Sequence, residues 1–151
     1  MSELPVGPLL FDTGIYIRFS RGERYPWLGK DARVFQRTVL TAVVAAELYA
    51  GIRDHREKRV VDELCRAHSA LGNFSSPQAA EWIQAGILLR SARAALGQTD
   101  VVRHFRDVLI ALEATRADAT LVTENDGDFI RWRLLLRSAN QTLRVFRPEW
   151  R

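Results

Sequence analysis

The apolar residues of this chain fall into short runs that alternate with amphipathic stretches. Four of these runs have the length of short strands, at 9–12, 38–41, 120–123 and 143–146. Between them, apolar residues recur every three or four positions, which is the spacing of a helix face. We expect helices at 15–19, 43–53, 58–71, 76–96, 104–116 and 129–137, and a mixed loop with a short helix over 20–37. Short apolar strands separated by helices predict an α/β fold with a parallel sheet that helices cover on both faces.

Length and apolar content bound the architecture. The chain has 151 residues, of which 47% are hydrophobic, so we expect one domain over 1–151. No apolar run approaches a membrane span, and the N-terminus lacks the pattern of a signal peptide. The one cysteine, Cys65, cannot form an internal disulfide and is expected to be a small buried residue. These features predict a cytoplasmic protein without a membrane contact.

Four carboxylates stand beside apolar runs, where a small domain usually has neutral residues. They are Asp12, Glu47, Asp107 and Asp128. A buried carboxylate is costly unless it is paired, protonated or bound to a metal ion, and no Lys or Arg obviously pairs the first three. The sequence therefore predicts an acidic cluster that collects a divalent cation. Because oxygen ligands select hard cations, we expect Mg²⁺, with Mn²⁺ as an alternative, rather than zinc.

The expected sheet explains how acids so far apart in the sequence can meet. In open α/β sheets, functional groups gather at the carboxyl ends of the strands. Asp12 ends the first expected strand, and Asp128 follows the third after 125–127, an Asn-Asp-Gly expected to form a turn. Glu47 and Asp107 are expected in early turns of helices that can point to the same edge. All four acids are therefore expected to converge.

Each acid also has a purely structural interpretation. Asp12 and Asp128 are suitable N-caps for the helices that follow, and Asp107 suits the first turn of a helix. Glu47 has only apolar or small neighbours at helical spacing and is the hardest to explain in this way. The joint placement of the four acids thus carries the prediction. Acids expected on solvated helix faces are Glu81 and Glu113.

The net charge of +4 is carried almost wholly by arginine, since only Lys30 and Lys58 are lysines. Arginine offers a planar donor fork that suits phosphate groups. A basic surface around an acidic cluster fits a phosphodiester enzyme whose surface attracts the polyanion. The basic residues that follow the first two acidic positions are either solvated or grip phosphates: Arg18, Arg21, Arg24, Lys30, Arg53, His55, Arg56, Lys58 and Arg59.

The sequence blocks around the acids have a recognisable order and spacing. They are Leu-Phe-Asp-Thr-Gly at 10–14, Ala-Glu-Leu-Tyr-Ala-Gly-Ile at 46–52, Asp-Val-Leu-Ile-Ala at 107–111, and Leu-Val-Thr-Glu-Asn-Asp-Gly-Asp-Phe at 121–129. Together they resemble the successive motifs of PIN-domain ribonucleases, and most of all the VapC-like toxins of type II toxin–antitoxin pairs. The chain departs from the pattern at residues 18–37, which are longer and more basic than in compact members.

The resemblance implies a PIN-like three-layer α/β/α fold with a central parallel sheet, and a Mg²⁺-dependent endoribonuclease. Asp12 and Asp107 would be the principal metal ligands, Glu47 would complete the site, and Asp128 would be the fourth acid. The last block also contains Asp126, so the resemblance leaves open whether Asp126 or Asp128 is the fourth acid. Residues implied to support the site are Thr13, Thr123 and Asn125.

The resemblance also implies partners. These are an RNA substrate, a cognate antitoxin that docks near the site, and a second copy of the chain in a homodimer. Apolar helix faces would supply most of the affinity, and the candidates are 60–71 and 82–96.

Other classes of small acidic α/β protein fit the sequence less well. A phosphoryl-accepting receiver domain would need a lysine near the third strand, where Thr123 is followed by Glu124 and Asn125. A haloacid-dehalogenase-like phosphatase would need an aspartate where Gly14 stands, and no P-loop pattern occurs. Two alternatives stay open. One is a PIN-type nuclease outside a toxin–antitoxin system, acting on DNA or RNA, and the other is a non-catalytic PIN-like module that binds RNA or protein.

Overall fold

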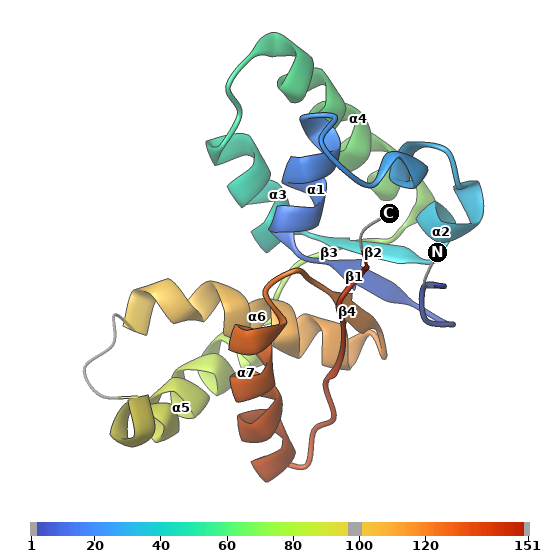
Figure 1. Ribbon diagram of the computed structural model, residues 1–151. Coiled ribbons are helices and arrows are strands. Elements are labelled where there is room, and N and C mark those ends of the chain that lie inside the picture. Colours follow the sequence, from blue (N-terminus) through green and yellow to red (C-terminus); the bar gives the residue numbers. More distant parts are fainter. Residues whose placement is uncertain (1–2, 97–100, 150–151) are drawn as a thin grey trace.

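The centre of the protein is a parallel β-sheet (Figure 1). The computed structural model describes residues 3–96 and 101–149, and within these ranges the sheet has five strands. In spatial order they are β3 (Phe74–Ser75), β2 (Thr38–Thr41), β1 (Leu9–Phe11), β4 (Thr120–Val122) and β5 (Arg144–Phe146). Leu10 of β1 pairs with Val39 on one side and Leu121 on the other. All of β1 is buried, as a strand covered on both faces must be.

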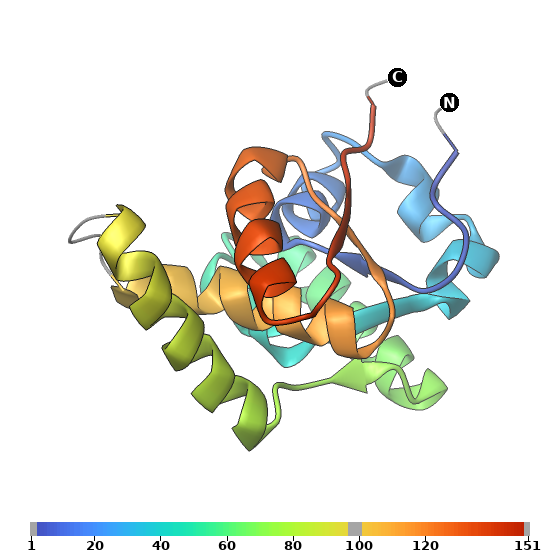
Figure 2. The same cartoon turned by 90° about the horizontal axis from the view of Figure 1, so that it is seen from below.

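Helices cover both faces of the sheet and make three layers (Figure 1). One face carries α1 (Thr13–Ser20), the 3-10 helix η1 (Pro26–Gly29), α2 (Ala32–Gln36), α3 (Ala42–Ala50) and α4 (His55–Leu71). The other face carries α5 (Ala79–Leu96), α6 (Val101–Arg116) and α7 (Asp126–Ser138). Figure 2, which views the molecule from the side of these three helices, shows them packed against one another. The predicted α/β/α architecture with a central parallel sheet is confirmed.

Local capping chemistry explains where the helices begin. The side chains of Asp12, Asp31, Thr41 and Asp54 each accept a hydrogen bond from a backbone N–H in the first turn of the helix that follows. Such caps satisfy backbone donors that have no partner inside the helix. At the other end of α4, Gly72 takes a φ of +71°, which glycine adopts without steric cost.

The structure differs from the predicted elements in several places, since α3 ends at Ala50, α5 begins only at Ala79 and α6 begins already at Val101. The strand β3 was not predicted, because two residues are too short to show an apolar pattern. The helix α7 begins at Asp126, so the expected turn at 125–127 is instead the start of that helix. The helix α4 begins at His55, before the apolar spacing starts. In the described ranges, no helix is both long enough and apolar enough to cross a membrane.

The expectation that Glu81 and Glu113 lie on solvated faces is wrong, since both are buried. Glu113 accepts hydrogen bonds from the hydroxyl groups of Thr41 and Ser75, and Glu81 pairs with Arg116 at 2.7 Å. The contacts of Glu113 tie α6 to the ends of β2 and β3, and the Glu81–Arg116 pair ties α5 to α6. The spacing of apolar residues shows which face of a helix is apolar. It does not show that the ends of β2 and β3 pack against Glu113 of α6.

Candidate active site at the carboxyl edge of the sheet

The chain leaves β1 and β4 in opposite directions, which makes their carboxyl ends the switch point of the sheet. Ligands of open α/β sheets bind at such a switch point. Asp12 follows β1 directly, and its backbone N–H donates to the carbonyl oxygen of Val122 in β4 over 2.9 Å. The hydroxyl of Thr123 donates to Asp12 Oδ2 over 2.8 Å, while the backbone N–H of Thr13 donates to Oδ1 over 2.8 Å. Asp12 is therefore a helix cap and also the centre of this edge.

Glu47 and Asp107 reach the same edge from α3 and α6. The Thr13 hydroxyl donates to Glu47 Oε2, which links Glu47 to the Asp12 turn. The guanidinium of Arg106 bonds Glu47 Oε1 and also Asp107 Oδ1, the latter at 3.0 Å and 3.2 Å from Nη2 and Nε. Asp107 lies in the second turn of α6, so the first-turn interpretation of this acid is wrong. Three of the predicted acids thus belong to one hydrogen-bonded network.

Asp128 joins the network through the loop after β4. The backbone N–H of Asn125 donates to the Thr123 hydroxyl over 2.9 Å, and the Asn125 amide donates to Asp128 Oδ2 over 2.9 Å. Asp126 instead pairs with Arg147 at 2.8 Å. Asp128 is exposed in the first turn of α7 and is not the N-cap, a place that Asn125 takes. The geometry therefore favours Asp128 over Asp126 as the fourth acid, a role that stays a prediction.

The electrostatics show that the acids act on one another. Burial raises the pKa of Asp12, and the Asp107 carboxylate raises it further, against the hydrogen bonds from Thr123 and Thr13. Burial also raises the pKa of Asp107, which the nearby Asp128 and Glu47 reinforce and Arg106 opposes. The raised pKa values of Asp12 and Asp107 thus reflect both burial and the negative charge that gathers at this edge.

The expectation that no arginine pairs these acids is wrong. Arg106 stands directly before Asp107 in the sequence and pairs with both Asp107 and Glu47. Adjacent residues on a helix do not face each other, so adjacency alone did not indicate the pair. The contact depends on α3 and α6 lying side by side at this edge.

The donor chemistry of the site fits a hard divalent cation, because Asp12, Glu47 and Asp107 offer carboxylate oxygens and two of these acids are buried. Within residues 3–96 and 101–149, however, no three His, Cys, Asp or Glu side chains are arranged to hold a metal ion as they stand. The Arg106 guanidinium lies between Glu47 and Asp107 and spans the carboxylates that a cation would need.

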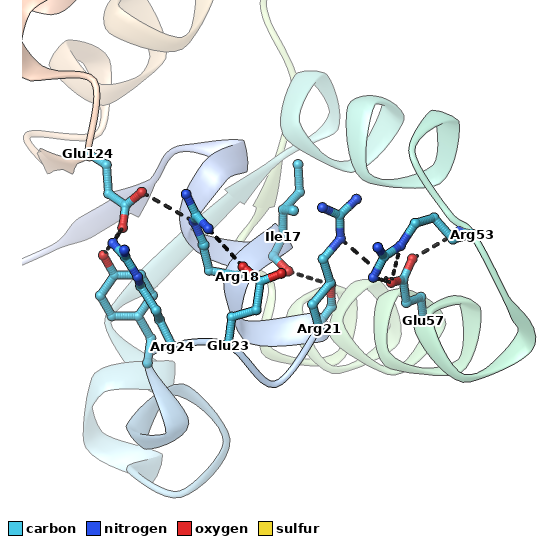
Figure 3. Close-up of polar contacts among 10 residues, drawn as sticks. Ile17, Arg18, Arg21, Glu23, Arg24, Arg53, Glu57 and Glu124 are labelled. Carbon is cyan, nitrogen blue, oxygen red and sulfur yellow. Dashed lines mark hydrogen bonds and ion pairs between the residues drawn. The ribbon is translucent and has the colours of Figure 1, made fainter. Parts of the chain in front are cut away.

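Glu124, which is not one of the four site acids, holds the loop after β4 in place (Figure 3). Glu124, between Thr123 and Asn125, pairs with Arg24 at 2.7 Å, lies 3.6 Å from Arg18 Nε, and accepts the Tyr25 hydroxyl. Burial and the hydrogen bond to Glu124 raise the pKa of Tyr25 to about 12. Sequence reasoning missed this contact because about a hundred positions separate the partners.

Several of the basic residues predicted to contact phosphates form ion pairs within the protein. Arg53 makes two side-chain bonds and one backbone bond to Glu57, and Arg21 lies 3.7 Å from the same carboxylate (Figure 3). Lys58 pairs with Asp62 at 2.8 Å. In the part of the chain that the structure describes, Arg56 and Arg59 are exposed and make no ion pair with a side chain. These two arginines remain the better candidates for phosphate contacts.

Three solved structures share this fold. VapBC2 from Rickettsia felis, bound to a DNA fragment from its promoter, has 19% identity and a TM-score of 0.63, over 93% of this chain and 98% of that chain. FitAB bound to an IR36 DNA fragment has 18% identity and a TM-score of 0.60, over 93% and 94%. FitAcB from Neisseria gonorrhoeae has 20% identity and a TM-score of 0.59, over 91% and 96%. No family model and no curated protein sequence matches the chain.

These neighbours are PIN-domain toxin structures of the VapC and FitB type. At such low identity the likeness establishes the fold. The chain therefore has the PIN-type fold that the resemblance of its four sequence blocks implies.

Proposed function

We propose that this protein is a metal-dependent endoribonuclease and the toxin of a type II toxin–antitoxin pair. The observation that carries the proposal is the continuous network Asp128–Asn125–Thr123–Asp12–Thr13–Glu47–Arg106–Asp107 at the switch point of the sheet. The shared fold of toxins solved in toxin–antitoxin complexes supports the second half.

The four acids have distinct parts in this proposal. Asp12 and Asp107 are the buried acids and the principal ligands of Mg²⁺ or Mn²⁺. Glu47, fixed by the Thr13 hydroxyl, completes the ligand set. Asp128, exposed and held by Asn125, lies where it can orient water or an outer ligand. A bound cation would activate a water molecule and neutralise charge on the scissile phosphate.

The proposed inhibitor is an antitoxin segment with an apolar face. A groove of about 660 Å³ lies between the α1–α2 region and α4, and it is lined mainly by apolar side chains. It includes three residues of the face predicted at 60–71. An amphipathic helix can lay its apolar face into such a groove. The apolar side chains that line it are Phe19, Leu28, Phe35, Val60, Leu64 and Ala67.

The proposed homodimer contact lies on α5. Trp82, Ile83 and Ile87 are exposed there, whereas Leu88, predicted with them, is buried in the core. Exposed apolar residues gathered on one helix face indicate an association surface. Molar mass measured by light scattering on wild-type protein and on Ile83→Glu tests this contact, and a monomeric wild-type protein would remove it.

Cleavage is tested on protein purified free of any antitoxin. We expect cleavage of RNA with Mg²⁺ or Mn²⁺ and none in EDTA, and no cleavage by Asp12→Asn under the same conditions. Equal cleavage by Asp12→Asn would point to a contaminating nuclease. A broad RNA and DNA panel separates the alternatives, since cut DNA alone supports a DNA nuclease and no cut supports a binding module.

The toxin assignment needs a separate test. Expression of the chain alone should arrest growth, and co-expression of an adjacent small gene should restore growth and yield a stable complex. Harmless expression in the native host with that neighbour deleted would remove the toxin role and leave the nuclease role standing.

A further inference from the structure

Arg106 joins two of the four candidate site acids. Its guanidinium bonds Glu47 and Asp107 at the same time, and these acids come from two different helices. The Asp107 side chain is 7% exposed, whereas that of Arg106 is 44% exposed. Arg106 therefore lies on the solvent side of the buried Asp107.

Arg106 occupies carboxylate oxygens that a cation would need. Two N–H groups of Arg106 donate to the single oxygen Asp107 Oδ1, and a third donates to Glu47 Oε1. The remaining oxygen of Glu47 accepts the Thr13 hydroxyl. The guanidinium of Arg106 lies between Glu47 and Asp107. Its positive charge therefore stands where a divalent cation would bind their oxygens.

We infer that Arg106 is a built-in counter-ion that competes with the divalent cation for Glu47 and Asp107. This inference rests on the proposed function, because it concerns the same acids. In the protein without a cation, Arg106 neutralises acids that would otherwise repel one another. When a cation binds, Arg106 must leave these carboxylates, so the site opens only at a sufficient cation concentration.

The exposure of Arg106 makes such an exchange feasible. Ion pairs that reach solvent hold weakly because water and salt screen them, and a long side chain swings away without disturbing the core. Asp12, by contrast, is held by Thr13 and Thr123 and keeps its place throughout. The exchange therefore moves one side chain and leaves the sheet edge unchanged.

The test measures cation affinity by calorimetry with Mn²⁺ and with Mg²⁺, in the absence of RNA. Arg106→Gln removes the competing charge and should bind the cation about tenfold more tightly than wild type. Arg106→Lys keeps the charge and should stay near the wild-type affinity. The matched control is Arg66→Gln, which removes an equal charge from an exposed pair with Glu63 on α4 and should change nothing.

Each outcome decides the inference. Equal affinity of Arg106→Gln and wild type, or weaker binding by the variant, overturns the competition and leaves the nuclease proposal intact. Tightening by Arg106→Lys equal to that of Arg106→Gln overturns the role of the charge. No cation binding by any variant overturns both proposals, whereas tighter binding without RNA cleavage supports this one and removes the nuclease.

A second readout follows the arginine itself. The Nε–H signal of Arg106 in ¹⁵N-labelled protein is identified by its loss in Arg106→Lys. It should shift as Mg²⁺ is added, with the same Kd that calorimetry gives. Saturable Mg²⁺ binding that leaves this signal unmoved would show that the guanidinium stays on its carboxylates, and would overturn the exchange.

Discussion

The pKa values of carboxylates near arginine shift in opposite directions in two regions of this protein. In the contacts of Figure 3, Arg53 lowers the pKa of Glu57, with a smaller contribution from Arg21. Burial alone would raise the pKa of Glu124, but hydrogen bonds from Tyr25 and Arg24 outweigh it and lower that pKa. At the candidate site, burial raises the pKa of both Asp12 and Asp107 in spite of Arg106.

The difference separates acids that fasten the fold from acids held for chemistry. Glu57 joins the start of α4 to the end of α1, and Glu124 joins the loop after β4 to the segment before η1. Both are matched by more than one arginine. The site acids share one arginine that reaches solvent, so their charge is left for another cation. Such acids cost stability in the folded protein, and a functional site tolerates that cost.

The strongest test of the comparison is loss of activity at the site with the fold intact. Asp12→Asn and Asp107→Asn should each reduce RNA cleavage more than about 10³-fold, because a neutral amide is a weak ligand. Glu47→Gln should be nearly as severe. Glu57→Gln is the control from the other region, because Glu57 pairs there with Arg53 and Arg21. A loss of similar size there, with normal cation binding, would show that the distinction between the two regions is wrong.

The next largest effect separates two neighbouring acids. Asp128→Asn should lower cleavage about tenfold or more, because Asp128 belongs to the site network. Asp126→Asn should change it little, since this acid pairs with Arg147 away from that network. The initial rate of cleavage measures both. An essential Asp126 beside a dispensable Asp128 would reverse the assignment of the last block.

Stability should change with opposite sign in the two regions. Without a metal ion at neutral pH, Asp12→Asn should raise the free energy of unfolding by about 1 kcal/mol, because it removes a buried charge that Asp107 repels. Glu124→Gln should lower it by about 1 kcal/mol, because it weakens a partly buried ion pair. Urea denaturation of both variants measures the difference, and equal signs would contradict it.

Both stability differences should disappear in acid. The pKa of folded Asp12 lies above the unfolded value of 3.8, so wild type bears its full cost above the folded pKa and none below 3.8. The folded pKa of Glu124 lies below 4.5, so its contribution is complete above 4.5 and is lost as the pH falls through the folded pKa. Denaturation repeated across this pH range checks both signs, and a gain for Asp12→Asn that grew in acid would refute the buried-charge account.

The smallest expected effect concerns RNA binding by the arginines. Replacing Arg56 and Arg59 with Gln should weaken RNA binding several-fold and reduce the salt slope by up to about 2, since each phosphate contact releases counterions. Replacing Arg53 should change the slope less, because Glu57 already holds its charge. Binding is measured with Asp12→Asn as background so that RNA stays intact. An unchanged slope in the double variant would show that RNA follows another path.

The sequence predicted most of the strands and helices that position the site. Short apolar runs and helical spacing are local properties, so they indicated four of the five strands, most of the helices and the parallel sheet. Since parallel strands end at one edge, the place of Asp12 after β1 and of Thr123 after β4 followed from order along the chain. The likeness to PIN-type toxin structures then agreed with the resemblance of the blocks.

What surrounds the acids was decided only by the tertiary structure. Arg106 pairs with Glu47 because α3 and α6 meet, and Glu113 is buried because two strand ends cover it. Asp126 pairs with Arg147 because β5 returns beside β4, and Glu124 pairs with Arg24 because the loop after β4 lies beside the segment before η1. The sequence by itself determined which residues carry charge and where the chain turns. Which charges neutralise one another depends on distances between segments far apart in the chain, and packing alone sets those distances.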